Sequence, residues 1–284
     1  MKNYSLGIYE KAMSPFLTWD ERMRLAKKIG FDYIEMSIDE TDERLSRLQM
    51  SRMERRKIVT EGMKHNLPVG SICLSGHRRF PMGSADEAIR RRGMEIMESA
   101  IDLACDLGVR IIQIAGYDVY YEQSTEETKK WFLENLIKSV EMAAKRGVIL
   151  GFETMETPFL NTVKKCMYYI ELVNSPWLQI YPDIGNMTNA AAAEGGDAVS
   201  DLKTGAGHIL AIHLKETIPG KFREIPFGTG HVEFDKIIRA AVRMGVRRFT
   251  MEMWDTDEDN WERNLWKSYE FLLSKFPKDY KLRR

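Results

Sequence analysis

Short apolar runs alternate with longer amphipathic stretches along the whole chain. Short runs bounded by glycine or polar residues are typical of buried strands. The stretches between them repeat apolar residues at intervals of three and four, as amphipathic helices do. We predict eight strands, at residues 5–9, 31–37, 67–74, 109–115, 148–152, 177–181, 209–214 and 246–253.

Polar residues at the ends of the amphipathic stretches indicate where the first helices begin and end. Thr18 is a candidate N-cap for a helix that ends at Gly30, and a long helix is predicted from about residue 42 to residue 65. Residues 84–87 and 124–127 have the pattern of capping boxes, each opening a further helix.

The second half of the chain continues the same pattern. Asn161 opens the helix after the fifth strand, and the closing helices are expected at residues 234–244 and 260–276. The helix before the seventh strand, over residues 197–208, has the weakest pattern because three glycines, counted from Gly196, interrupt it.

The alternation of strand and helix repeats without a linker or a low-complexity segment. Glycine separates a predicted helix from the following strand at four places, which is a weak internal sequence repeat: Gly30, Gly108, Gly147 and Gly245. Eight strands alternating with eight helices are the pattern of a (β/α)8 TIM barrel. A length of 284 residues with 44% hydrophobic content suits one such α/β domain, which we predict over residues 1–284.

Four side chains able to bind a divalent metal lie at the ends of successive predicted strands: Glu153, Asp183, His213 and Glu252. The first three are 30 residues apart, a period that fits one strand plus one helix, and adjacent parallel strands run about 4.8 Å apart. We therefore expect all four to meet at the carboxyl-terminal face of the barrel.

A single carboxylate at a strand end often caps a helix or pairs with an arginine. Three gathered in one barrel mouth would repel each other without a cation. The sequence therefore predicts a site for one divalent metal ion, and its oxygen-rich donors suit zinc, manganese, cobalt or magnesium. Because Glu153 and Glu252 flank the site, one base can face each side of a planar enediolate, as inversion of a carbon centre requires.

Composition restricts the binding partners and the cellular setting that we expect for the protein. Basic and acidic residues number 42 each, so the formal net charge is zero and no overall field favours nucleic acid or an anionic membrane. The three cysteines form no Cys-x-x-Cys motif, which argues against a disulfide framework or a structural zinc site and favours a reducing, cytoplasmic setting. No run approaches the ~20 apolar residues of a membrane span, so we expect a soluble protein that is not exported.

Several segments together resemble one enzyme family. They are residues 6–11, 75–81, 151–156, 181–186, 213–216 and 222–230, which span nearly the whole chain. The sequence resembles the xylose-isomerase-like sugar epimerases and isomerases and, within them, the L-ribulose-5-phosphate 3-epimerases, also called L-xylulose-5-phosphate 3-epimerases. The resemblance implies a ketose phosphate as the small-molecule substrate and a homodimer. It also implies Glu153, Asp183, His213 and Glu252 as metal ligands, with Glu153 and Glu252 as the acid/base pair.

One departure separates the chain from the free-ketohexose 3-epimerases of the same group. Those enzymes have a substrate-binding histidine three residues after the metal aspartate, where this chain has Asn186, and Arg223 only loosely matches their arginine. Asn186 and Glu156 are candidates to hydrogen-bond substrate hydroxyls. The basic candidates for a phosphate group are His77, Arg78, Lys215 and Arg223, although a loop salt bridge also explains the first two.

The sequence is also compatible with other functions. A ketohexose 3-epimerase or a 1,2-aldose–ketose isomerase would use the same scaffold, since both reactions pass through an enediolate. A related family repairs abasic DNA, but it needs further histidines that are missing where the fourth strand ends at residues 114–116 and in the loop at residues 222–224. A non-catalytic metal-binding barrel would have no need of two surplus bases beside the ion.

Overall fold

The computed structural model describes residues 3–254 and 259–277. Within these residues, eight parallel strands form one sheet in the order β6-β5-β4-β3-β2-β1-β8-β7. Parallel bridges from Ile180 to Ile209 and from Asp183 to His213 join the two edge strands and close the sheet. The predicted (β/α)8 barrel is confirmed. Its strands are β1 (Ser5–Tyr9), β2 (Tyr33–Ile38), β3 (Val69–Leu74), β4 (Ile111–Ala115), β5 (Ile149–Glu153), β6 (Leu178–Ile180), β7 (Ile212–Leu214) and β8 (Arg248–Met251).

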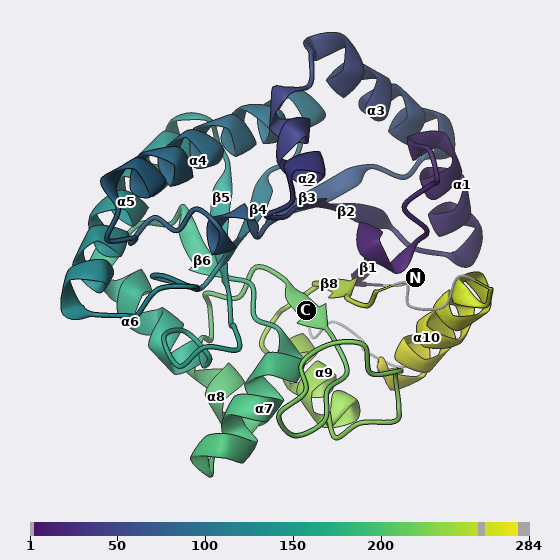
Figure 1. Cartoon of the computed structure of the whole chain (residues 1–284). Helices are drawn as coiled ribbons and strands as arrows, with labels where there is room; N and C mark the ends of the chain where they lie inside the picture. Colours follow the sequence, from purple (N-terminus) through teal and green to yellow (C-terminus); the bar gives the residue numbers. More distant parts are fainter. Residues whose placement is uncertain (1–2, 255–258, 278–284) are drawn as a thin grey trace.

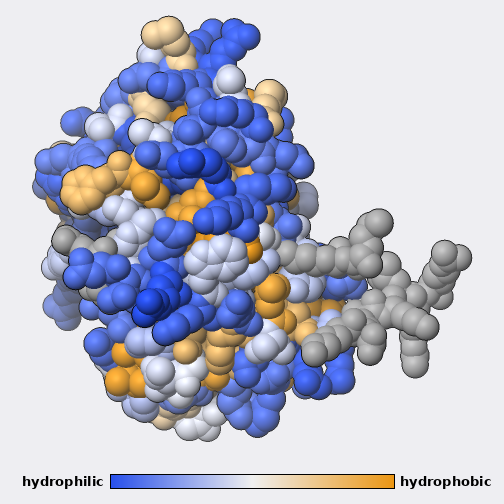
Figure 2. All heavy atoms as spheres, turned by 90° about the vertical axis from the view of Figure 1, so that its right-hand side faces the viewer, coloured by the Kyte–Doolittle hydropathy of each residue, from blue (hydrophilic) through white to orange (hydrophobic). Residues whose placement is uncertain are grey.

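Helices surround the strands and cover their outer face (Figure 1). On the side of the barrel that carries α1 and α10, hydrophilic side chains dominate the surface and apolar ones are scattered among them (Figure 2). The helices are α1 (Trp19–Ile29), α2 (Asp42–Ser46), α3 (Arg52–His65), α4 (Glu87–Leu107), α5 (Glu126–Lys145), α6 (Val163–Val173), α7 (Ile184–Glu194), α8 (Ala198–Thr204), α9 (Phe234–Arg243) and α10 (Trp261–Lys275), with the 3-10 turns η1 (Glu10–Ala12), η2 (Arg47–Gln49) and η3 (Gly76–Arg78).

Several strands are shorter than their apolar runs. β6 and β7 have only three residues each, and β8 is also shorter than its run. The outlying apolar residues still pack in the core, as the burial of Ala211 and Val246 shows. Hydrophobicity predicts which residues are buried and not which ones form strand hydrogen bonds, so the predicted strands extend beyond the residues that pair in the sheet.

The helix predicted over residues 42–65 is wrong as a single element. The structure has α2, then η2, and then α3, which begins after Ser51. The Ser51 side chain accepts from the backbone N–H of Glu54, and Glu54 reaches back to the Ser51 backbone in a capping box. A capping box inside a charged, amphipathic stretch starts a new helix, because it replaces the hydrogen bonds that a continuing helix would make there.

The segment between β6 and β7 also differs from the prediction. The helix predicted over residues 197–208 is present as the shorter α8, but a further helix was missed, because α7 begins directly after Asp183 and ends at Gly195, which has a left-handed φ of 69°. The short α8 then precedes β7. The Asp183 carboxylate accepts from the backbone N–H of Asn186 at 2.7 Å. The helix start and the candidate metal ligand are therefore the same residue.

The predicted helix starts are close to those observed. Thr18 forms a capping box with Glu21, as expected. The N-caps of three later helices are each one or two residues downstream of the predicted positions: Asp86 for α4, Thr125 for α5 and Thr162 for α6. Ser84 and Asn161 contact other parts of the chain instead, through Glu122 and Glu194.

A buried ion cluster ties the first two βα units together. Glu10, directly after β1, contacts Arg22 of α1, Arg44 of α2 and Arg47 of η2. Burial opposes ionisation of Glu10, but the guanidinium groups of Arg47, Arg44 and Arg22 hold the pKa of its carboxyl below the ordinary value. The loops after β1 and β2, which border the barrel mouth, are thus fixed to one another.

Two further expectations concern composition. All three cysteines are free, in agreement with the absence of a disulfide framework. Among the residues that the structure describes, none of the helices combines the length and the hydropathy needed to cross a membrane.

Candidate metal centre and active site

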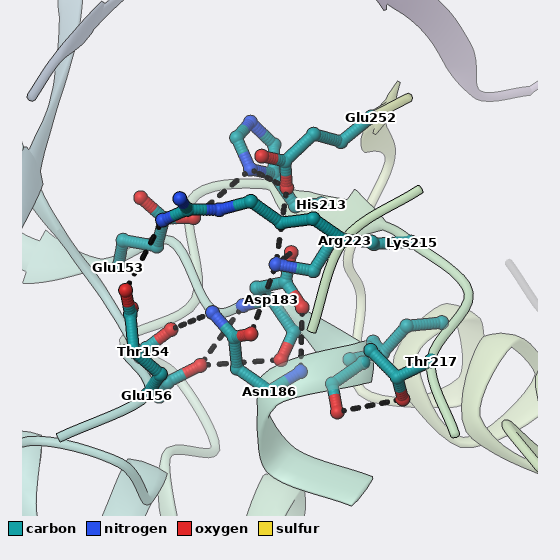
Figure 3. Close-up of polar contacts among 12 residues, drawn as sticks. Glu153, Thr154, Glu156, Asp183, Asn186, His213, Lys215, Thr217, Arg223 and Glu252 are labelled. Carbon is teal, nitrogen blue, oxygen red and sulfur yellow. Dashed lines mark hydrogen bonds and ion pairs between the residues drawn. The ribbon is translucent and has the colours of Figure 1, made fainter. Parts of the chain in front are cut away.

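Four side chains converge at the carboxyl-terminal end of the barrel (Figure 3). Glu153 is the last residue of β5, Asp183 follows β6, His213 lies in β7, and Glu252 directly follows β8. One nitrogen or oxygen of each lies within 4.8 Å of the others, and all four side chains are buried. The bridge between Asp183 and His213, which closes the barrel, is also what places two of the four side by side.

His213 lies at the centre of the group. Its Nδ1 is 2.9 Å from Glu252 Oε2 and 3.4 Å from Glu153 Oε1. Although burial lowers it, the pKa of His213 is raised well above its ordinary value by the carboxylates of Glu35 and Glu252. The imidazole therefore has anionic groups on both of its nitrogen-bearing edges.

Lys215 adds a buried positive charge beside these residues. Its Nζ lies 3.0 Å from Asp183 Oδ2 and 3.7 Å from Glu252 Oε2, and it donates to Asn186 Oδ1 at 2.9 Å. Burial lowers its pKa, but Asp183, Glu252 and Glu153 outweigh that effect and raise it. Lys215 stays charged near neutral pH and compensates part of the carboxylate charge.

The three carboxyl groups experience different environments. Burial raises the pKa of Asp183 well above its ordinary value, and it also raises the pKa of Glu153. Burial acts on Glu252 in the same direction, but Lys215 and His213 outweigh it and hold the pKa of Glu252 well below its ordinary value. Ionisation of all three carboxyl groups together requires more positive charge than Lys215 and His213 supply.

The donor set fits a divalent cation. Asp183 Oδ2 and Glu252 Oε2 are buried and accept no hydrogen bond of good geometry, although Lys215 Nζ and His213 Nδ1 lie beside them at 3.0 and 2.9 Å. Protein donors therefore replace only part of their lost hydration. A cation between these oxygens, Glu153 and His213 would replace the rest. Three carboxylates and one imidazole suit magnesium, manganese, cobalt and zinc alike, so the ligands do not select one of these metals.

A cavity opens above the four residues. Glu153 and Glu252 line its floor, while Asp183 and His213 lie below. The other lining residues come from the strand ends and from the loops, 3-10 turns and helix start that follow them. Five of them are predicted substrate contacts: Arg78, Glu156, Asn186, Lys215 and Arg223. The remainder are Tyr9, Lys11, Cys73, Ser75, Met155, Phe222 and Trp254.

Glu156 connects basic and aromatic side chains on one wall of the cavity. It accepts from Tyr117 at 2.8 Å, from Tyr120 at 3.2 Å and from Arg223 Nη2 at 3.1 Å. Arg223 extends across the cavity to make this contact (Figure 3). Arg78 lies over the Tyr120 ring at 4.9 Å, and its Nη2 is 4.0 Å from the same carboxylate.

His77 is the one predicted substrate contact that the structure does not bring to this cavity. Its ring is buried, and Nε2 donates to the Gly93 carbonyl of α4 at 3.0 Å. Burial lowers the pKa of His77 to about 4, so the ring is neutral near neutral pH. The side chain joins η3 to α4 and offers no charge to a ligand.

Two polar residues below the cavity were not predicted, Glu35 of β2 and Gln113 of β4. Both are buried inside the barrel, where they contact His213. The sequence of β2 itself indicates that Glu35 has a special role, because this residue is charged and lies in the middle of the apolar run Tyr33–Ile38. A charge there, on a strand buried along its whole length, requires a buried partner.

Comparison with known proteins agrees with this geometry. Residues 23–275 match the family described as "Xylose isomerase-like TIM barrel". The chain is 47% identical over 260 residues to L-ribulose-5-phosphate 3-epimerase UlaE of Shigella boydii serotype 18, covering 91% of this chain and 90% of the relative. The same values hold for L-ribulose-5-phosphate 3-epimerase UlaE of Escherichia coli strain SE11.

Solved structures show the same fold at lower identity. D-allulose 3-epimerase from Methylomonas sp., in complex with D-allulose, superposes with a TM-score of 0.78 at 19% identity over 97% of this chain and 98% of that one. Together with the identity to the UlaE proteins, the family match shows the relationship. The chain belongs to the xylose isomerase-like TIM barrel family and, within it, to the L-ribulose-5-phosphate 3-epimerase family of isomerases.

Proposed function

We propose that this chain is a metal-dependent 3-epimerase that interconverts L-ribulose 5-phosphate and L-xylulose 5-phosphate. The observation that carries the proposal is the placement of Glu153 and Glu252, two buried carboxyl groups that reach one cavity from β5 and β8. Inversion at a carbon next to a carbonyl needs a proton removed from one face and returned to the other. Family membership and the relatives' names support C3 of a ketose phosphate as the reacting position.

Glu153, Asp183, His213 and Glu252 would hold the divalent ion. When bound, the ion supplies Lewis-acid polarisation of the substrate carbonyl and stabilises the negative charge of the enediolate. Lys215 and Asn186 border the same centre, and their hydrogen bond supports a role in orienting substrate oxygens.

The two carboxyl groups carry the proton. Burial raises the pKa of Glu153, whereas Lys215 and His213 overcome burial and hold that of Glu252 well below its ordinary value. Environments that separate two pKa values in this way suit one group to hold a proton and the other to remove one. In one direction, Glu252 removes the C3 proton and Glu153 returns a proton to the opposite face, and the reverse reaction exchanges these roles.

The phosphate group needs an anion site that a free sugar does not. Arg78 and Arg223 line one wall of the cavity, and both approach the carboxylate of Glu156. Arg78 Nε is buried without a hydrogen-bond partner, so its guanidinium has donor capacity to spare. We assign the phosphate to Arg78 and Arg223, and we do not include His77.

The first prediction concerns the metal. Asp183→Asn and His213→Ala should each remove most of the bound metal and most of the epimerase activity, because each weakens the shared coordination of one ion. The apolar barrel should remain folded by circular dichroism. Elemental analysis of the purified variants beside activity measurements provides the test, and full activity of a metal-free variant would contradict the proposal.

The second prediction concerns the two bases. Glu153→Gln and Glu252→Gln should each abolish net epimerisation, while the remaining base still exchanges the C3 proton that faces it. One variant should incorporate deuterium from D2O into L-ribulose 5-phosphate and the other into L-xylulose 5-phosphate, as detected by proton NMR. Glutamine keeps a carbonyl oxygen for the ion, and metal content must be measured for each variant as the control. If a metal-loaded variant still interconverts the two ketoses at close to the unmutated rate, the roles given to these residues are wrong.

The third prediction concerns the phosphate. Arg78→Met should raise the KM for L-ribulose 5-phosphate about tenfold or more with a smaller change in kcat, since a charge-assisted hydrogen bond contributes about 1.5–3 kcal/mol. Turnover of unphosphorylated L-ribulose should change little. Arg79→Met is the matched control, because Arg79 is half exposed and pairs with the exposed Asp42. Equal KM changes for both substrates, or for both variants, would exclude Arg78 as the phosphate contact.

A further inference from the structure

Glu35 is an unusual side chain for the inside of this barrel. It lies in the middle of β2 and is completely buried. The interior of a TIM barrel is normally filled by branched aliphatic side chains. A buried carboxylate is costly unless it is paired and hydrogen-bonded, so the partners of Glu35 indicate its role.

Three donors surround the Glu35 carboxylate. Ser71 Oγ donates to Oε2 at 2.6 Å, and the Tyr181 hydroxyl donates to the same oxygen at 2.9 Å. The other oxygen, Oε1, contacts Nε2 of His213. With Oε2 held by β3 and by the residue after β6, Oε1 is directed at one edge of the imidazole.

The opposite edge of the same ring faces the candidate metal centre. His213 Nδ1 lies 2.9 Å from Glu252 Oε2 and 3.4 Å from Glu153 Oε1. A neutral imidazole carries its proton on one nitrogen and offers a lone pair only on the other. Metal-binding histidines commonly donate their second N–H to a carboxylate, which sets the tautomer.

We propose that Glu35 is a positioning residue that keeps the proton of neutral His213 on Nε2, so that Nδ1 binds the divalent ion. This inference rests on the metal site of the proposed function. Packing fixes the plane of the ring separately, because the Gln113 amide contacts the ring nitrogens and the Tyr181 ring lies edge-on at 5.0 Å. The contribution of Glu35 is therefore the location of the proton and the basicity of Nδ1.

Three variants separate this role from general packing. Glu35→Met removes the acceptor at similar volume, and Glu35→Gln keeps an acceptor oxygen but removes the charge. Ser71→Ala is a graded comparison, since it removes one of the two hydrogen bonds that hold Glu35 Oε2 and leaves the bond from Tyr181 in place. Circular dichroism and thermal melts establish that each variant is folded, and Glu35→Gln carries the test if Glu35→Met does not fold.

The measurements are zinc affinity by calorimetry against a competing chelator and imidazole ¹H–¹⁵N spectra of the zinc-loaded protein. We expect affinity to fall about 10–100-fold in Glu35→Met and less in Glu35→Gln, with the smallest loss in Ser71→Ala because Tyr181 still holds Oε2. The unmutated protein should show a metal-bound Nδ1 and a protonated Nε2 for His213.

Two outcomes would overturn the inference while leaving the proposed function intact. One is unchanged zinc affinity in a folded Glu35→Met or Glu35→Gln variant, and the other is a His213 spectrum with the metal on Nε2. Neither measurement uses a sugar, so neither depends on the substrate assignment. If the unmutated protein binds no zinc, manganese, cobalt or magnesium, the metal site of the proposed function fails, and this inference fails with it.

Discussion

Three carboxyl groups and one buried lysine share a single site at the mouth of the barrel, and their charges do not balance. Glu153, Asp183 and Glu252 together carry three negative charges when ionised, whereas Lys215 supplies one positive charge. A divalent ion would supply the other two, with His213 as a neutral ligand. Burial raises the pKa values of Asp183 and Glu153, and the neighbouring carboxylate of Glu252 adds to the effect, so the protein alone disfavours three ionised carboxyl groups.

The fold brings these groups together where the barrel closes between β6 and β7, which is the least regular part of the sheet. β6 and β7 are the shortest strands, and isolated bridges rather than a ladder join them. One of those bridges pairs Asp183 with His213, and Asp183 also caps α7. Closure of the barrel, the start of a helix and the assembly of the centre therefore depend on the same few residues. Below them, polar residues replace the usual aliphatic filling, which links the barrel interior to the chemistry above it.

The regular parts of this arrangement were predictable from sequence. The 30-residue spacing of Glu153, Asp183 and His213 reflects one βα unit per ligand, and the structure brings the three together with Glu252 as that spacing predicts. The break at Ser51 and the separate α7 were missed, because local capping chemistry decided them against the hydrophobic pattern. The positions of Glu35 and His77 could not be predicted from sequence for a different reason. Whether a polar residue faces the barrel interior, the cavity or a neighbouring helix depends on contacts between distant strands and helices.

Removal of the C3 proton is what would distinguish the proposed 3-epimerase from a 1,2-isomerase. The decisive measurement is proton NMR of L-ribulose 5-phosphate incubated in D2O with the metal-reconstituted protein. We predict deuterium at C3 together with the appearance of L-xylulose 5-phosphate, as expected if the two proposed bases act on opposite faces of that carbon. Deuterium at C1 with an aldose phosphate as product would contradict this prediction and would identify a 1,2-isomerase on the same scaffold.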